Sequence, residues 1–394
     1  MILFLKNDFI TGIKMNEKKI GIAVIACGMR SKYTVGNLLR DSNHNVEVLA
    51  VYDPIDSVVE EALDLWQVDR KCCRKCSSST EAINTPGVDW VLVYSPNAFH
   101  KEHILEAFAA GKHVFSEKPL AATLEDCKEI YDAHCKSDLL FATGFVLRYS
   151  PLYQRVKNLL DSGKFGKILS IEANENIPPA HGGYIMRNWR RKNEISGPHI
   201  LEKCCHDLDL IIWFCNSLPS KVFFCGSTNV FKSENRYLEE KYGAETFNNW
   251  GGHDQIESAF NDDSDMMDTS MGTAIFRNGI QVSFCATMCN AIEERRMRFN
   301  CSEGTIIVDL YKSAVSYKTI GDKELYTVNL GTDLHGGGDS FIMKELYESM
   351  SRGVPPKCSG NDGLESAVFA LAFDKSAREG KLIDLEPTWK SLGR

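Results

Sequence analysis

Short apolar segments alternate with amphipathic helical segments through residues 19–147, and this alternation limits the fold more than any other feature. The apolar runs are rich in Val and Ile and too short for buried helices, as in KIGIAVI at residues 19–25. Strands that alternate with helices form parallel, doubly wound sheets, so residues 19–147 are predicted to be an α/β domain. The strands are expected at residues 19–25, 46–52, 90–94, 113–116 and 139–143, and the helices at 31–40, 57–66, 101–110 and 124–137.

Beyond Arg148 the predicted strands follow one another directly. The turns at Asn278-Gly279 and Ser302-Glu303-Gly304 indicate antiparallel hairpins. Residues 148–394 are therefore predicted to be an α+β domain on a large, open, mostly antiparallel sheet, which binds substrate and carries subunit contacts. The strands are expected at residues 168–173, 221–227, 269–276, 281–287, 296–301, 304–310 and 314–319, and the helices at 151–160, 199–214, 340–352 and 364–379.

Two segments lie outside this pattern. Residues 231–267 are polar, rich in Asn and Asp and weakly periodic, so they are predicted to be a long loop or an insertion. Residues 1–18 are predicted to be an extension outside both domains. Met15 stands just before the first strand, which suggests that residues 1–14 come from a start codon assigned too early.

Charge and hydropathy argue against two classes of partner. The chain has 45 Lys and Arg against 53 Asp and Glu, a net charge of −8, which disfavours binding to nucleic acid. No apolar run reaches the ~20 residues that span a bilayer, and no export signal is evident, so a cytoplasmic protein is expected. The 14 cysteines are then expected to be thiols rather than disulfides. Cys73 and Cys76 form a C-x-x-C pair without a second pair or spaced histidines, so no metal site is predicted.

The first strand ends in a loop that fits a dinucleotide. Ala26-Cys27-Gly28-Met29-Arg30-Ser31 stands in the place of a G-x-G-x-x-G motif, with only the middle glycine kept. That glycine lets the pyrophosphate approach because it has no Cβ, and the helix N-terminus that follows favours anions. An ordinary strand–turn–helix corner is the alternative, and the loop alone does not exclude it.

The second strand ends at Asp53, near the offset of ~20 residues at which an acid binds the ribose hydroxyls. A carboxylate there repels a 2′-phosphate, which favours NAD over NADP, whereas Arg30 taken alone argues for NADP. The alternative is that Asp53 only starts a turn before Pro54.

Two further loops follow strands of the same sheet and reach its carboxyl edge, where ligands bind in such folds. They are SPNAFH at residues 95–100 and EKPLA at residues 117–121. Lys118 follows a buried strand, where a charge is costly unless it meets an anion or a polar substrate. The alternative is that Lys118 is a surface lysine in a loop. The predicted cofactor-binding residues are Cys27, Gly28, Met29, Arg30, Asp53, Ser95, Pro96, Asn97, His100, Glu117 and Lys118.

The helix predicted at residues 199–214 carries a polar stripe. Glu202, His206 and Asp209 are spaced i, i+4 and i+7, so one face of a continuous helix would hold all three. A lone histidine on an apolar helix is usually structural, but two carboxylates flank this one, which favours a functional role.

Taken together, these segments resemble the Gfo/Idh/MocA family of sugar and cyclitol oxidoreductases over nearly the whole chain past Lys19. The resemblance implies an NAD-binding Rossmann domain and a site in which Lys118, His206 and residue 202 surround the reacting carbinol. The family has an aspartate where this chain has Glu202, which leaves the role of Glu202 open. The matching segments are IGIAVIACGMR (20–30), SPNAFHKEHILEAFAAGKHVFSEKPLA (95–121), GFVLRYSPLYQRVKNLLDSGKFGKI (144–168), WRRKNEISGPHILEKCCHDLDLIIW (189–213) and HGGGD (335–339).

The activity implied is hydride transfer between the nicotinamide of NAD and a sugar, cyclitol or glycoside hydroxyl carbon. His206 is predicted to be the general base, Lys118 to polarise the hydroxyl, and Glu202 to orient His206 or bind a neighbouring hydroxyl. Two alternatives stay open: an NAD-dependent glycoside hydrolase or lyase that oxidises its substrate transiently, and a non-catalytic sensor that binds NAD.

Substrate contacts are expected from aromatic rings that stack on sugars and from polar loop residues near the domain junction. Ordinary packing or helix capping is the alternative for each. A homodimer or homotetramer is also expected, because a large open sheet leaves an apolar face to cover. The candidate substrate contacts are Arg148, Tyr149, Trp189, Arg190, Asp209 and His335.

Overall fold

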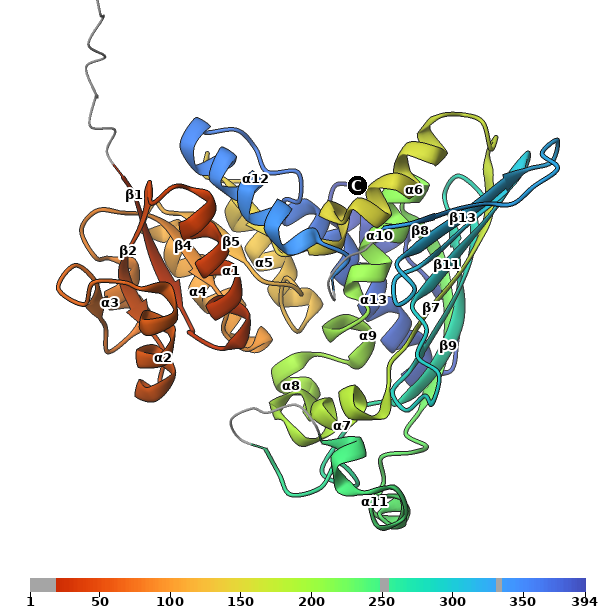
Figure 1. Ribbon diagram of the computed structural model, residues 1–394, viewed down its shortest axis with the longest axis horizontal. Coiled ribbons are helices and arrows are strands. Elements are labelled where there is room, and N and C mark those ends of the chain that lie inside the picture. The colour runs from red at the N-terminus through yellow and green to blue at the C-terminus, as the bar shows by residue number, and fades with distance from the viewer. Residues whose placement is uncertain (1–18, 249–254, 331–334) are drawn as a thin grey trace, which may run out of the picture.

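The computed structural model describes residues 19–248, 255–330 and 335–394, which fold into two parts, each built on one sheet. Figure 1 shows the two parts side by side, with the six-stranded sheet and its helices in red to orange on the left and the nine-stranded sheet on the right. Residues 1–18, the predicted extension, lie outside the described residues.

The N-terminal part is the predicted parallel α/β domain. Its strands are hydrogen-bonded in the order β3-β2-β1-β4-β5-β6, and every neighbouring pair is parallel. The strand order reverses between β1 and β4, so the carboxyl ends of these strands border the crevice in which such sheets bind ligands. The elements are β1 (Ile20–Ile25), α1 (Met29–Asp41), β2 (Val46–Tyr52), α2 (Asp56–Trp66), β3 (Arg74–Lys75), α3 (Ser79–Ile83), β4 (Val88–Val93), α4 (His100–Ala109), β5 (His113–Ser116), α5 (Leu124–His134) and β6 (Phe141–Thr143).

The C-terminal part is built on a sheet in the order β14-β13-β12-β11-β7-β10-β9-β8-β15. All neighbours are antiparallel except β7 and β10, which confirms the predicted large and mostly antiparallel sheet. The strands are β7 (Ile168–Asn176), β8 (Pro219–Ser227), β9 (Thr269–Phe276), β10 (Gln281–Thr287), β11 (Arg296–Cys301), β12 (Gly304–Asp309), β13 (Ala314–Thr319), β14 (Tyr326–Asn329) and β15 (Ile383–Asp384).

Helices pack on one face of the nine-stranded sheet, between it and the N-terminal part (Figure 1). Phe224 of β8 stacks on Phe373 with 4.3 Å between ring centroids, and Phe214 meets Phe299 of β11 edge-on. None of the helices in the described ranges has the length and apolarity to cross a membrane. The helices are α6 (Pro151–Asp161), α10 (Cys205–Cys215) and α13 (Gly360–Glu379) on the sheet, α12 (Gly338–Arg352) against α1, and α14 (Glu386–Ser391) near the C-terminus.

The helix predicted at residues 199–214 is in fact two helices, which corrects the interpretation of its polar stripe. α9 (His199–Glu202) ends after one turn, and α10 begins at Cys205. The N–H of Lys203 still bonds to the carbonyl of His199, and the N–H of Leu208 bonds to that of Cys204. A carbonyl at a helix end needs a partner from outside the helix, and the carbonyl of Glu202 finds one in a lysine. Glu202 and His206 therefore do not share one continuous helix face.

The polar segment at residues 231–267 is an insertion with its own apolar cluster rather than a structureless loop. Its described part forms η4 (Ser233–Asn235), α11 (Tyr237–Tyr242) and η5 (Ala244–Phe247). Phe231, Phe247 and Phe260 are buried against α7 (Pro179–Arg187), a helix that the sequence pattern does not predict. The buried apolar side chains of this insertion are widely separated in the sequence, which agrees with its weak periodicity.

Candidate active site

The loop between β1 and α1 has the backbone geometry of a dinucleotide-binding loop. Ala26 has a φ of +69°, in the left-handed region that favours glycine, and its N–H donates to the carbonyl of Tyr52 at 2.7 Å. α1 begins directly after Gly28, and a Cβ on Gly28 would meet no atom within 4 Å. A pyrophosphate needs this open approach to a helix N-terminus. The loop therefore fits NAD, and Ala26 adopts the conformation of a glycine despite its methyl group.

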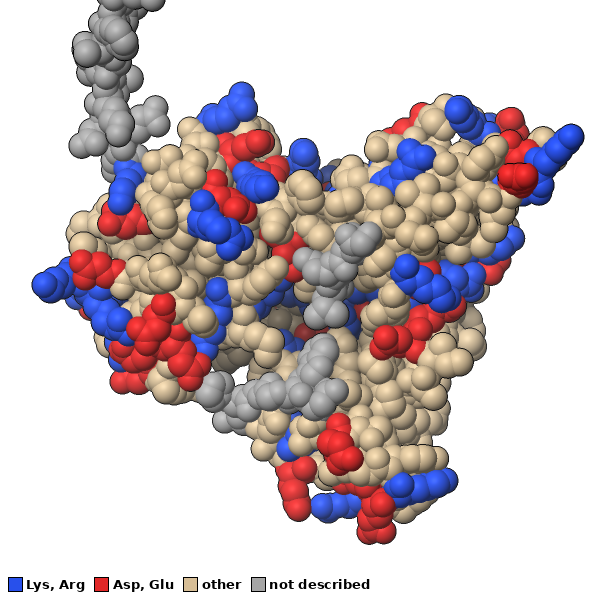
Figure 2. Space-filling view, viewed as in Figure 1, with Lys and Arg blue, Asp and Glu red and all other residues tan. Residues whose placement is uncertain are grey.

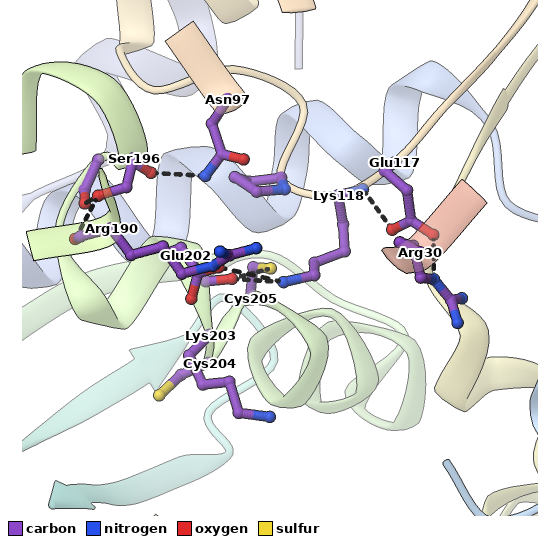
Figure 3. Close-up of polar contacts among 12 residues, drawn as sticks. Arg30, Asn97, Glu117, Lys118, Arg190, Ser196, Glu202, Lys203, Cys204 and Cys205 are labelled. Atoms are coloured by element: carbon purple, nitrogen blue, oxygen red, sulfur yellow. Dashed lines mark hydrogen bonds and ion pairs between the residues drawn. The ribbon is translucent and has the colours of Figure 1, made fainter. Parts of the chain in front are cut away.

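Two charged residues predicted to bind the cofactor are engaged by the protein. The carboxylate of Asp53 accepts the N–H groups of Cys27 at 2.8 Å and Ile55 at 2.9 Å, which ties the end of β2 to the loop. Arg30 turns toward Glu117, and its Nε donates to Oε1 at 2.5 Å (Figure 3). Met29, by contrast, is 67% exposed at the start of α1.

The loops after β4 and β5 are joined by His100. Its two ring nitrogens lie 2.8 Å from the carbonyl oxygen of Ser95 and 2.9 Å from that of Pro119, so the imidazole bridges the loops. Asn97 reaches the C-terminal part, where its amide donates to the carbonyl of Ser196 at 2.7 Å (Figure 3). The predicted cofactor loops thus meet at one edge of the parallel sheet. Figure 2 shows that the surface is hollowed where the two parts of the chain meet.

Lys118 and Glu202 meet across this junction. Lys118 Nζ donates to the main-chain oxygen of Glu202 at 2.6 Å and lies 4.0 Å from its carboxylate. Arg190 Nε donates to the same carboxylate at 2.8 Å (Figure 3). Burial alone would raise the pKa of Glu202, but the charges of Lys118 and Arg190 lower it to about 2, so the carboxylate is ionised. The longer side chain that replaces the family's aspartate is the shared counter-ion of two cations.

His206 is buried on α10, and its Nδ1 atom has no hydrogen-bond partner among the residues that the structure describes. Phe145 lies edge-on to its ring at 6.0 Å between centroids, and the ring of His335 is 6.3 Å away. Burial, and then the charge of Lys118, holds the pKa of His206 well below its usual range. The imidazole is therefore neutral and can accept a proton. A buried polar atom without a partner calls for a ligand or water, so Nδ1 is a candidate substrate contact.

Three of the predicted substrate contacts are paired with other protein groups. Arg148 and Asp209 form a two-point ion pair, with Nε–Oδ2 at 2.8 Å and Nη2–Oδ1 at 2.7 Å. The hydroxyl of Tyr149 donates to Glu345 of α12 at 2.9 Å. These pairs hold η2 (Val146–Tyr149) against α10 and α12.

The other three candidates flank the group around Glu202 and His206. The guanidinium of Arg190 lies 4.2 Å from the ring centroid of Trp189 and 5.2 Å from that of Tyr184. His335 Nδ1 lies 2.7 Å from Asp339 Oδ2 at the start of α12. Sequence reasoning missed Tyr184 and Asp339 as site residues. Asp339 belongs to the HGGGD segment, and this motif could have indicated it as a site residue. Tyr184 lies on α7, whose sequence has no clear helical pattern.

Family matches cover most of the described chain. Residues 20–145 match the oxidoreductase family with an NAD-binding Rossmann fold, Gfo/Idh/MocA, and residues 157–385 match the C-terminal alpha/beta domain of that family. The chain belongs to the Gfo/Idh/MocA family. It is thus an oxidoreductase whose N-terminal part is an NAD-binding Rossmann domain, and its predicted fold class is confirmed.

Relatives of this Gfo/Idh/MocA protein include dehydrogenases. It is 22% identical to the putative oxidoreductase YteT of Bacillus subtilis over 66% of this chain and 72% of that protein. It is 26% identical to myo-inositol 2-dehydrogenase of Thermotoga maritima over 78% of this chain and 82% of that protein. Among solved structures, levoglucosan dehydrogenase in complex with NADH and levoglucosan shares the fold, with a TM-score of 0.78 and 19% identity over 93% of this chain and 100% of that chain.

Proposed function

We propose that this protein is an NAD-dependent dehydrogenase that oxidises a hydroxyl-bearing carbon of a sugar, cyclitol or glycoside. The observation that carries the proposal is the buried, neutral imidazole of His206, whose Nδ1 atom is unpartnered in the described chain and whose pKa is lowered by burial and by the charge of Lys118. A polarised hydroxyl needs a cation and a base of this kind. The names of the relatives, myo-inositol 2-dehydrogenase and levoglucosan dehydrogenase, support a polyhydroxylated substrate.

His206 acts as the general base, because a neutral imidazole takes up the hydroxyl proton as the carbon is oxidised. Lys118 directs its ammonium to the same oxygen and stabilises the negative charge that develops there. Glu202 holds that ammonium through its main-chain oxygen and its ionised carboxylate. The nicotinamide of NAD, when bound, supplies the hydride chemistry.

The substrate stacks on the aromatic residues beside Arg190. Trp189 and Tyr184 flank that guanidinium, and a sugar presents apolar C–H faces that such rings accept. His335 has its ring 6.3 Å from that of His206, is held by Asp339 of α12, and is placed to bond a second hydroxyl. Arg148, Tyr149 and Asp209 support η2 through the pairs described above rather than through substrate contacts.

NAD is the proposed cofactor, in preference to NADP. Asp53 places a carboxylate at the end of β2, which repels a 2′-phosphate. Arg30 is the residue that argued for NADP, and its guanidinium is taken up by carboxylates of the protein. Comparing the KM values for NAD and NADP with one substrate tests this preference.

Replacing His206 tests the catalytic proposal. We expect His206→Asn to lower kcat by roughly 10²–10⁴-fold, the usual contribution of a general base, while NAD binds as in the wild type. His134→Asn, on α5 and outside the site, is the matched control. A His206→Asn enzyme that turns over sugars at the wild-type rate contradicts the assignment, and a wild type that oxidises no member of a sugar and cyclitol panel contradicts the function.

A glycoside hydrolase or lyase that uses NAD transiently is the second candidate. The observation that favours it is a second imidazole, that of His335. Asp339 orients this ring, and its centroid lies 6.3 Å from that of His206. A second acid or base so close suits removal of a proton beside an oxidised carbon. Aryl glycosides separate the two functions, because a dehydrogenase accumulates NADH and a hydrolase releases the aglycone without net NADH. A sensor that binds NAD without turnover would do neither.

A second copy of this chain is the proposed partner of the open face of the nine-stranded sheet. Apolar side chains are exposed there on adjacent strands, and a face of this kind is usually covered. We expect a homodimer or homotetramer by light scattering, and Met271→Glu should dissociate it. The side chains are Phe223 (42% exposed) of β8, and Met271 (60%) and Ile275 (47%) of β9.

The cysteines support a reducing, cytoplasmic location. All 14 are free thiols, and eight are buried: Cys27, Cys73, Cys76, Cys127, Cys204, Cys205, Cys215 and Cys358. Disulfides mark proteins of oxidising compartments, so a chain this rich in unpaired thiols is suited to the cytoplasm.

A further inference from the structure

Arg30 of the cofactor loop contacts both halves of the active site. Its Nε donates to Glu117 Oε1 at 2.5 Å, and its Nη1 donates to Asp339 Oδ1 at 2.6 Å. Glu117 belongs to the Rossmann domain and Asp339 begins α12 of the other domain, so one side chain spans the junction. We propose that Arg30 is a positioning residue for the reaction, which sets Lys118 and His335 relative to each other across the domain junction.

The first arm runs through Glu117 to Lys118. While Oε1 of Glu117 accepts from Arg30, Oε2 accepts the N–H of Lys118 at 3.1 Å. Gly144 leaves the space for this carboxylate, since a Cβ there would lie 2.7 Å from Oε2. Lys118 then extends to the main-chain oxygen of Glu202. The backbone from which the lysine starts is thus fixed by Arg30 (Figure 3).

The second arm runs through Asp339 to His335. Oδ1 of Asp339 accepts from Arg30, and Oδ2 accepts from Nδ1 of His335 at 2.7 Å. The two oxygens belong to one rigid carboxylate. The bond from Arg30 to Oδ1 therefore also fixes where Oδ2 points, and with it the position of the His335 ring. His335 in turn lies beside the ring of His206.

The charges explain why an arginine is needed. The side chains of Glu117 and Asp339 are only 10% and 6% exposed, and one guanidinium lies between them. A guanidinium presents several N–H groups in a planar fork and can serve two carboxylates at fixed angles, whereas an ammonium is a point charge on a flexible stem. Arg30 therefore acts by geometry as well as by charge.

The inference rests on the proposed function, and two single variants with their double test it. Arg30→Lys keeps the charge and loses the fork, and Asp339→Asn keeps the shape and loses one anion. We expect each to lower kcat on the order of 100-fold, as misplacement of reacting groups does, with the Kd for NAD unchanged. The double variant should be no slower than the slower single, because both substitutions break the same link.

The control variant is Tyr347→Phe, which removes another bond across the same junction, from Asn45 Nδ2 to the Tyr347 hydroxyl at 3.0 Å. Its kcat should equal that of the wild type. Losses that multiply in the double variant, a wild-type kcat in Arg30→Lys, or a loss explained by weaker NAD binding would each overturn the inference.

A readout without turnover separates this inference from the proposed function. The imidazole N–H of His335 that bonds Asp339 gives an NMR signal, which should move or broaden in Arg30→Lys and stay in Tyr347→Phe. If the wild type oxidises no sugar but this signal responds as expected, the proposed function fails and the link from Arg30 to His335 stands. An unchanged signal in Arg30→Lys removes the link itself.

Discussion

Lys118, in the loop after β5, donates a hydrogen bond from Nζ to the main-chain oxygen of Glu202 at the break between α9 and α10. The bond joins the Rossmann domain to the C-terminal domain through a backbone atom, which no substitution at position 202 removes. The main-chain oxygen of Glu202 positions the ammonium of Lys118, and the carboxylate of Glu202 supplies the negative charge near it. Different substitutions can therefore test the two effects.

Removing the ammonium of Lys118 should slow catalysis strongly without preventing cofactor binding. We expect Lys118→Met to lower kcat/KM by roughly 10²–10³-fold, because the oxygen that develops negative charge loses its cation. The apolar part of the side chain stays in the methionine variant. Steady-state assays of NADH formation and calorimetric titration with NAD measure the two effects. A kcat/KM near that of the wild type would show that Lys118 only holds the domains together.

Glu202 should stabilise the fold in a pH-dependent way. Its pKa is lowered from 4.5 to about 2 in the folded protein, so it contributes stability above pH 4.5 that is lost as the pH falls toward about 2. Urea unfolding should show the wild type more stable than Glu202→Gln by a few kcal/mol at neutral pH, on the order implied by 1.36 kcal/mol per pKa unit. The gap should close as the pH falls through that window. A gap that does not vary with pH would mean that Glu202 acts by packing alone.

The Rossmann strands could be predicted because each central strand is a continuous apolar run, and this pattern is typical of parallel strands that are buried on both faces. β3 could not, since it has only two residues, Arg74 and Lys75, and both are exposed. The break at Lys203 and Cys204 carries neither proline nor glycine. The carbonyl of Glu202 at this break bonds to Lys118 of the other domain, and no local pattern of the sequence records such a contact.

In the candidate site, too, the residues with a local sequence motif could be predicted, and the contacts between distant residues could not. Lys118 and His206 could be named from motifs of fixed order, whereas the partners of charged residues could not. Arg30 meets Asp339 across 309 positions of sequence, and Arg148 meets Asp209 rather than standing free for a substrate. A side chain's charge predicts that it has a partner, but only the fold decides which one.

The oxidation reaction should keep its rate well below the ordinary titration range of histidine. Burial and the charge of Lys118 hold the pKa of His206 well below 6.5, so the imidazole stays neutral and able to act as a base as the pH drops through that value. We expect kcat/KM for oxidation to show no loss centred near pH 6.5. The pH profile of kcat/KM measures this, with stability followed at each pH. An acid limb near 6.5 would place the titrating base elsewhere.

Ala26 should be a point of backbone strain in the cofactor loop. Its φ of +69° is one that a residue with a Cβ adopts at a cost of ~1–2 kcal/mol, and glycine adopts freely. Glycine also adds freedom to the unfolded chain, which offsets ~0.5–1 kcal/mol of that gain. Ala26→Gly should therefore raise the free energy of unfolding by up to ~1 kcal/mol. Ala109→Gly, at the exposed last residue of α4, is the matched control and should lower it, by less than the ~0.5–1 kcal/mol that glycine costs in the middle of a helix. Urea unfolding of both variants compares the signs, and an Ala26→Gly protein that is destabilised like Ala109→Gly would show that the loop carries no strain at Ala26.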